Sequence, residues 1–104
     1  MTELDQLTAQ IKQATDYQVN KQILREKIQA DLHFAYNGGL FKASPELIGF
    51  INAWDADALY LEDTYQNPIE VTRNEFLLLC RQHYQIVMNA WHIQHAELKR
   101  VRKV

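Results

Sequence analysis

Apolar side chains recur at three- and four-residue intervals along the first third of the chain, which is the spacing of a coiled-coil seam. The residues of this stripe are Leu4, Leu7, Ile11, Ala14, Tyr17, Leu24, Ile28, Leu32 and Ala35. Residues 2–36 contain no proline or glycine, and Asn37 and Gly38 can adopt the left-handed conformation that ends a helix. The pattern therefore predicts one long helix over about 2–36, packed along a second long helix.

The middle of the chain has the residues of a short helix followed by a hairpin. Ser44 is placed to cap a helix that begins at Pro45, and we expect this helix to run over about 45–54. Alternating leucines, a group of turn residues and a second apolar pair then predict a hairpin over about 58–71. An isolated hairpin is only marginally stable in water, so this one should lie on helices or add to a partner's sheet.

A second long helix is predicted over about 73–102, because Thr72 and Glu75 have the spacing of a capping box and no proline or glycine follows them. Its apolar arc consists of Phe76, Leu77, Leu79, Cys80, Tyr84, Ile86, Val87, Met88, Ala90, Trp91, Leu98 and Val101. A single antiparallel neighbour covers less than such an arc, so part of it should meet the short helix, the hairpin or a second subunit. The expected fold class is mainly α, with two long antiparallel helices and a short helix and a small β-hairpin inserted between them.

Size and composition fit one domain that spans residues 1–104. The chain has 104 residues, of which 47% are hydrophobic and 23% charged, so it can bury a single core. The net charge of −2 gives no overall electrostatic reason to expect nucleic acid or a membrane surface as a partner. The lone Cys80 cannot form an internal disulfide, and no segment resembles a signal peptide or the ~20 apolar residues of a membrane span. We therefore expect a cytoplasmic protein.

Two groups of side chains have residue types that can bind a metal ion. His83 and His95 lie twelve positions apart on the predicted helix, roughly 18 Å along its axis, which is too far to share a metal. His92 and His95 have a spacing that allows joint ligation but lack a third ligand, and Asp55 and Asp57 can ligate a hard cation or can simply be solvated turn residues. The sequence leaves these alternatives open, and we expect no metal or cofactor.

Charge is distributed unevenly along the chain. Residues 43–72 carry six acidic side chains and no basic one, so this insert presents an acidic surface that can contact another protein. The tail is basic and contains Lys99, Arg100, Arg102 and Lys103, the candidate contacts if the protein binds nucleic acid. The acidic insert and the basic tail are complementary, which can set the orientation of a pair of subunits.

The sequence gives no reason to expect an enzyme. Cys80 falls on the apolar stripe, where a thiol has a raised pKa and is unreactive, and His83 is better explained as its packing neighbour than as a catalytic base. Gly38 and Gly39 follow a predicted helix, whereas a phosphate-binding glycine loop follows a strand.

The segments "FAYNGGLFKASPEL" and "LEDTYQNPIEVTRNEF" give the chain a general resemblance to small proteins of unknown function encoded by large contractile-tailed phages, including those of marine bacteria. The resemblance spans most of the chain but includes no motif of known chemistry. It implies a phage accessory or assembly protein made in the host cytoplasm, and it assigns no functional residue.

The surplus of apolar surface indicates a helical protein–protein interaction or assembly protein that self-associates as a homodimer. The expected interface residues are Leu7, Ile11, Leu24, Ile28, Leu32, Tyr84, Val87, Met88, Trp91 and Leu98. The alternative is a nucleic-acid-binding accessory protein that uses the basic tail, although the overall charge does not favour nucleic acid as a partner.

Overall fold

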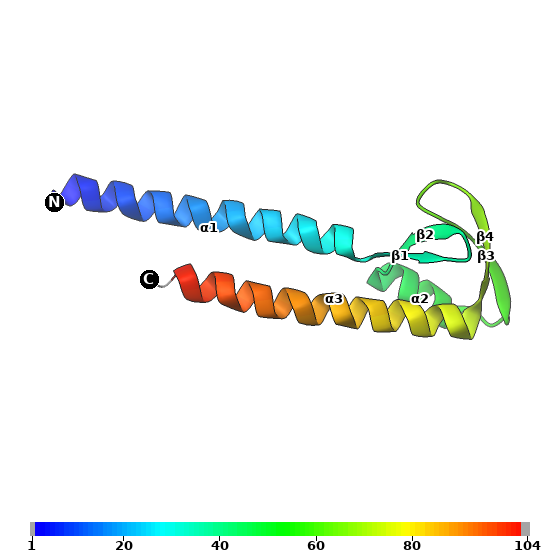
Figure 1. The fold of residues 1–104 in the computed structure, drawn as a ribbon. Coiled ribbons are helices and arrows are strands. Elements are labelled where there is room, and N and C mark those ends of the chain that lie inside the picture. Colours follow the sequence, from blue (N-terminus) through cyan, green and yellow to red (C-terminus); the bar gives the residue numbers. More distant parts are fainter. Residues whose placement is uncertain (1, 103–104) are drawn as a thin grey trace.

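The computed structural model describes residues 2–102 and confirms the predicted fold class, mainly α with two long antiparallel helices. In chain order the elements are α1 (Glu3–Asp31), β1 (His33–Tyr36), β2 (Gly39–Lys42), α2 (Pro45–Ala53), β3 (Ala58–Glu62), β4 (Pro68–Thr72) and α3 (Arg73–Arg102). The predicted short helix, the hairpin between it and the last helix, and the last helix itself are confirmed. Figure 1 shows α1 and α3 side by side, with the other elements gathered at one end.

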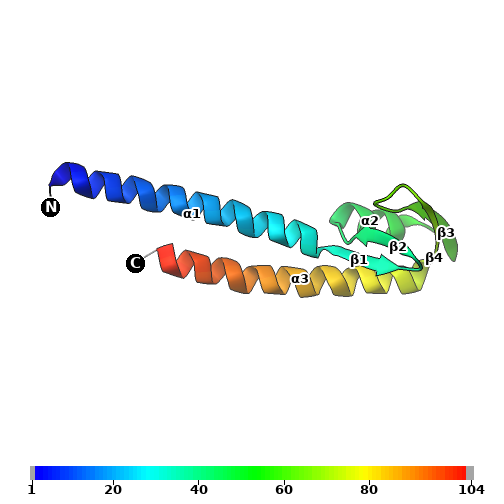
Figure 2. The same cartoon turned by 45° about the horizontal axis from the view of Figure 1, so that its top comes forward.

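The molecule is elongated, with principal extents of 68 × 23 × 20 Å. Its radius of gyration is 19.8 Å, whereas about 13 Å is expected for a compact domain of this length. We call residues 32–82, which hold the hairpins, α2 and the start of α3, the head, and we call α1 with residues 83–102 the stalk. The two views in Figures 1 and 2 both place the head at one end of the stalk. Such a shape leaves the start of α1 and one side of α3 exposed to solvent.

The prediction of one helix over 2–36 is wrong in its last turn. α1 ends at Asp31, and residues 33–36 form β1, which pairs antiparallel with β2. Asn37 has φ 48° and Gly38 has φ 83°, so both central residues of the connection have positive φ, as in a type I′ turn. An Asn-Gly pair between apolar residues favours this turn, and here it makes a hairpin instead of ending a helix. Residues 2–102 therefore contain two hairpins, each forming its own two-stranded sheet.

The main hydrophobic core lies in the head and is centred on Phe76. This side chain is fully buried, and its ring lies 5.0 Å from Phe41 and 5.1 Å from Tyr36 in edge-on contacts, and 5.7 Å from Phe34. The other buried residues of this core are Ile51, Leu59, Val71, Leu77 and Cys80. The two hairpins and α2 are thus held against the first turns of α3, which explains how such short strands are stable.

Asp63 joins the two hairpins through its carboxylate. Its Oδ2 accepts a hydrogen bond from the N–H of Leu40 in β2 (3.1 Å), and its Oδ1 accepts from the N–H groups of Tyr65 (3.0 Å) and Asn67 (2.8 Å). The Asp63 side chain is buried, and these donors leave it well satisfied. The hydrogen bond from Asn67, with those from Leu40 and Tyr65, keeps the pKa of Asp63 below its ordinary value, although burial acts in the opposite direction.

Gly39 of β2 lies close to Ile69 of the second hairpin. A Cβ atom at this position would lie 2.7 Å from Cγ1 of Ile69 and 3.1 Å from Cε2 of Phe41. We expect Gly39→Ala to lower the free energy of unfolding by about 1–3 kcal/mol, because the added methyl group overpacks the contact. Gly49 in α2 is the matched control, since a Cβ there meets no atom within 4 Å and alanine favours a helix. Urea denaturation that finds the two variants equally stable would contradict this packing argument.

The stalk has a smaller core at its head-proximal end. Ile28 and Leu32 of α1 are buried against Val87 of α3, with Leu24, Tyr84, Met88 and Trp91 partly buried around them. Two polar contacts flank this core: Nε2 of His83 donates to the carbonyl oxygen of Asp31 (2.7 Å), and Nζ of Lys27 donates to Oε1 of Gln94 (3.4 Å). These contacts fix the antiparallel register of α1 and α3 along one half of the stalk.

Candidate interaction surface

The structure divides the predicted interface residues into three groups. Ile28, Leu32 and Val87 are buried between α1 and α3 of the same chain, so they are not exposed for a contact with another chain. Leu24, Tyr84, Met88 and Trp91 are partly buried around that core, and Leu98 is also half-buried. The sequence pattern could not separate intramolecular from intermolecular contacts, because both require the same apolar stripe. Only Leu7 and Ile11 remain exposed.

The first part of α1 has no buried residue before Tyr17 among the residues that the structure describes. Every residue from Thr2 to Asp16 is exposed, and Leu4, Leu7 and Ile11 are between 53% and 70% exposed. The hydrogen bonds described for this segment are local: the Thr2 hydroxyl accepts from the N–H of Asp5 in a capping box. Figure 1 shows that the start of α1 extends beyond the end of α3. The apolar stripe of this segment is therefore open to solvent.

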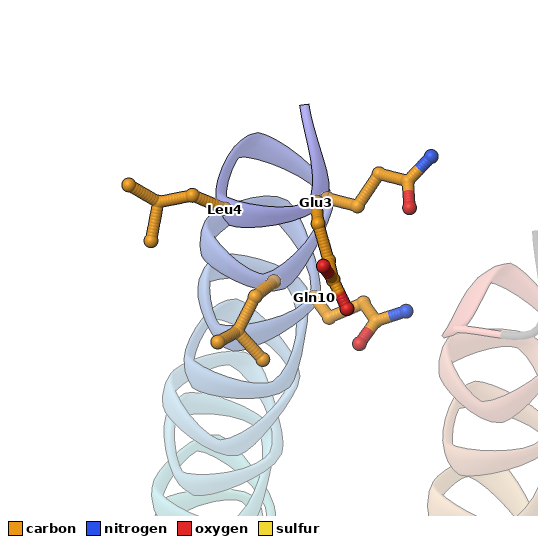
Figure 3. A pocket seen from close by; sticks show the side chains of 5 residues that line it. Glu3, Leu4 and Gln10 are labelled. Atoms are coloured by element: carbon orange, nitrogen blue, oxygen red, sulfur yellow. The ribbon is translucent and has the colours of Figure 1, made fainter. Parts of the chain in front are cut away.

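The orientation of this stripe is visible at the start of α1. Figure 3 shows Leu4 pointing away from the side on which the end of α3 lies, whereas Gln10 points toward that side. At about 100° per residue, Leu7 and Ile11 fall on the same face as Leu4. The stripe is thus directed away from α3 of the same chain. We call Leu4, Leu7 and Ile11 the α1 stripe.

A second exposed apolar stripe runs along α3 and was not recognised as a surface in the sequence. Leu79, Ile86 and Ile93 are 37%, 66% and 68% exposed. They follow one another at intervals of seven residues, so they share one face, roughly 120° around the helix from the residues that face α1 and the head core. The strict seven-residue spacing was the available signal, but in sequence these residues merge with the flank of the core arc. We call them the α3 stripe.

The total accessible surface area of the chain is larger than that of a compact monomer of the same mass. It is 7678 Å², whereas a compact monomer of 12.2 kDa exposes about 6,100 Å². The excess of roughly 1,600 Å² is large compared with the ~800 Å² that each partner contributes to a protein–protein interface of standard size. Residues 2–102 thus leave enough uncovered surface for contacts with another chain.

The structure places the acidic insert and the basic tail at opposite ends of the molecule. Residues 43–72 belong to the head, whereas Lys99 and Arg100 lie at the far end of the stalk, as Figure 1 shows. The guanidinium of Arg100 is paired with the carboxylate of Glu97, which raises the pKa of Arg100 and lowers that of Glu97. Arg102 is the last residue of α3, and Lys103 lies outside the described residues. Within one copy the two charged regions do not meet.

The three histidines of α3 do not converge. His83 contacts Asp31 and the ring of Phe34 (5.5 Å between centroids), whereas His92 and His95 line a shallow cavity of about 300 Å³ with Met88 and Trp91. Among residues 2–102, no three His, Cys, Asp or Glu side chains are placed together so that they could hold a metal ion.

Cys80 occupies the head core, as its place on the apolar arc predicts. Burial raises the pKa of its thiol to about 12, so the thiolate that nucleophilic chemistry requires is scarce. Packing in the head core is a sufficient reason for a cysteine at this position.

Comparisons with known proteins bring no further identification. No family model, no curated protein and no solved structure matches the chain. The resemblance to phage proteins therefore stays a prediction. None of the helices among residues 2–102 combines the length and the apolar character that crossing a bilayer requires.

Proposed function

We propose that this chain is a small helical assembly protein that acts by self-association, and that the α1 stripe is its contact surface. The proposal depends on one observation: residues 2–16 are all exposed and carry three large aliphatic side chains on one helical face. Monomeric proteins rarely expose large contiguous apolar patches, and such patches often mark sites of interaction with another protein.

The stability of the segment supports this proposal. In proteins, most of the stability of a helix comes from packing its apolar face and not from helix propensity. Capping by Thr2 satisfies part of its first turn, but no buried side chain anchors the helix before Tyr17. Packing against another helix supplies the missing apolar contacts, so association and helix formation should reinforce each other.

A second copy is the simplest partner for this stripe. Leu7 lies three residues after Leu4 and four before Ile11, so two copies of the segment can pack antiparallel with Leu4 of one copy near Ile11 of the other and the two Leu7 side chains close together. Such a contact is isologous, as in most homodimers. The same three residues then serve both subunits, and the pair buries six aliphatic side chains.

The test is the molar mass of the protein in solution. Sedimentation velocity over a micromolar concentration range should show a dimer or a larger species for the wild type. The variant with Leu7→Glu and Ile11→Glu should weaken the contact on the order of 100-fold, because charges replace buried aliphatic groups. The control carries Gln6→Glu and Gln13→Glu, which add the same charge to the same exposed segment outside the α1 stripe. A wild type that stays monomeric throughout would refute the proposal.

A further inference from the structure

We infer that the α3 stripe is a second contact surface, which binds the α3 stripe of another copy of this chain in antiparallel orientation. The inference goes beyond the proposed contact through α1, because it concerns a different helix and predicts assemblies larger than a dimer. It combines the exposure of Leu79, Ile86 and Ile93 with the way charge is distributed along α3.

The spacing of the stripe suits an isologous contact. Leu79 and Ile93 lie seven residues on either side of Ile86, so the stripe is symmetric about Ile86. An antiparallel partner places Ile86 against Ile86 of the second copy and Leu79 against Ile93. The stripe extends roughly 21 Å along the helix at 1.5 Å per residue. Ala90, between the two isoleucines, is small enough for the partner helix to approach closely.

Charge at the two ends of the stripe favours the antiparallel orientation. Glu75 lies one turn before Leu79 on the same face, in the first turn of α3. Arg100, seven residues after Ile93, lies at the opposite end. Pairing about Ile86 places Glu75 of one copy at the level of Glu97 of the other, whose carboxylate is paired with Arg100 of its own chain. Glu75 therefore meets a pair without net charge, whereas parallel pairing places each Glu75 beside its equivalent.

The same orientation brings together the two charged regions that lie apart within one copy. The basic end of the stalk, with Lys99 and Arg100, comes to lie along the head of the second copy, where residues 43–72 carry six acidic side chains and no basic one. Asp57 is close to the start of α3, since its carbonyl oxygen accepts a hydrogen bond from the N–H of Arg73 (2.9 Å). Complementary charge of this kind sets the register and orientation of a contact more than its strength.

The uncovered area also leaves room for a second contact. A standard interface hides about 800 Å² of each partner, so one contact accounts for about half of the excess surface of roughly 1,600 Å². The α1 stripe and the α3 stripe lie on different helices, and each is symmetric by itself. Two isologous contacts in one chain produce a closed tetramer or an open array.

The first experiment separates the two surfaces by mass. Four chains are compared by sedimentation velocity: the wild type, the α1 variant (Leu7→Glu, Ile11→Glu), an α3 variant (Ile86→Glu, Ile93→Glu) and their combination. We expect a species larger than a dimer for the wild type, dimers for each variant and a monomer for the combination. If the α1 variant equals the wild type and the α3 variant alone is monomeric, the proposed α1 contact fails and this inference stands. If the α3 variant equals the wild type, and the combination equals the α1 variant, this inference is overturned.

Two further variants test whether a change in mass comes from loss of the α3 stripe and not from added charge. Gln85→Glu with Ala96→Glu adds the same charge to exposed positions of α3 outside the stripe, and it should leave the mass unchanged. Ile86→Ala with Ile93→Ala removes the aliphatic groups without adding charge and keeps strong helix formers, so it should also lose the contact. Circular dichroism shows whether each variant keeps its helices. A folded alanine variant with the wild-type mass would count against the α3 contact.

The second experiment tests the orientation by charge exchange in the α1 variant, where only the α3 contact remains. We expect Arg100→Glu to weaken dimerisation roughly 3- to 10-fold, because it leaves two carboxylates, Glu97 and the new glutamate, near Glu75 of the other copy. Adding Glu75→Arg to this variant places a cation beside those carboxylates and should recover at least the wild-type affinity within about 2-fold. A double exchange that is no tighter than Arg100→Glu alone would exclude the antiparallel contact. Raising the salt concentration should reduce the differences among these variants.

Discussion

Replacing Phe76 by alanine is expected to lower the free energy of unfolding by about 3–5 kcal/mol. The side chain is fully buried and contacts Phe41 and Tyr36 edge-on, so its removal leaves a cavity where both hairpins meet α3. Because small domains have only about 5–15 kcal/mol of stability in total, this loss is a large fraction of what keeps the head folded. Urea denaturation followed by far-UV circular dichroism measures the loss.

The control for Phe76→Ala is Phe50→Ala. Phe50 lies in α2, is 50% exposed and packs its ring 5.6 Å from that of Trp54. We expect this substitution to cost less than about 1 kcal/mol, because little apolar area is removed from a buried site. Equal losses for the two variants would mean that Phe76 does not organise the head.

Asp63→Asn is expected to separate the two hairpins and to lower the melting temperature by roughly 5–10 °C. The carboxylate accepts hydrogen bonds on both oxygens, from Leu40 on one and from Tyr65 and Asn67 on the other. An asparagine offers one acceptor oxygen and places an NH₂ group against the remaining N–H donors. At least one buried N–H group then lacks an acceptor, and the charge that strengthened all three bonds is lost.

The pH dependence of stability provides a second measurement on Asp63. Its pKa in the folded protein lies below the ordinary value of 3.8, so the unfolded chain binds the proton more readily. The contribution of Asp63 is therefore complete above that ordinary value and is lost as the pH falls through the folded pKa. Melting temperatures measured between about pH 6 and pH 2.5 should fall more steeply for the wild type than for Asp63→Asn below about pH 4. Parallel curves for the two proteins would show that the carboxylate does not make this contribution.

The head and the stalk differ in what stabilises them. The head has an aromatic core and a buried carboxylate that connects its hairpins, so its structure is determined by contacts within one chain. The stalk has a small core around Ile28 and Val87, and beyond it the α1 stripe is uncovered. If self-association occurs as proposed, the outer half of the stalk is ordered by the partner, and its amides should exchange faster in dilute solution than those of the head.

Local chemistry explains why parts of the architecture could be predicted from sequence. Ser44 caps α2 with its hydroxyl, and Pro45 occupies the first helical position, as their residue types predict. The alternation of Leu59 and Leu61 correctly indicated β3. The long uninterrupted run after Thr72 correctly indicated α3. In each case the decisive interaction lies within a few residues of the chain, so the pattern itself contains the information.

Residues 33–42 show where local pattern was insufficient. His33–Tyr36 has no helix breaker, and its apolar residues continue the helical stripe, yet it forms a strand because Phe34 and Tyr36 pack against Phe76, some forty residues away in sequence. The Asn-Gly turn permits this hairpin, but the contacts that favour it over another helical turn are tertiary.

By itself, the sequence determined that the chain is mainly helical, that two long helices flank a short helix and a hairpin, and that more apolar surface exists than one helix pair can bury. Only the tertiary structure decided which apolar residues are used within the chain. It buries Ile28, Leu32 and Val87 and leaves Leu7, Ile11, Ile86 and Ile93 in solvent. Helical periodicity reports which residues share a face, but the neighbour that covers a face depends on how distant segments pack, and no spacing within one helix specifies that.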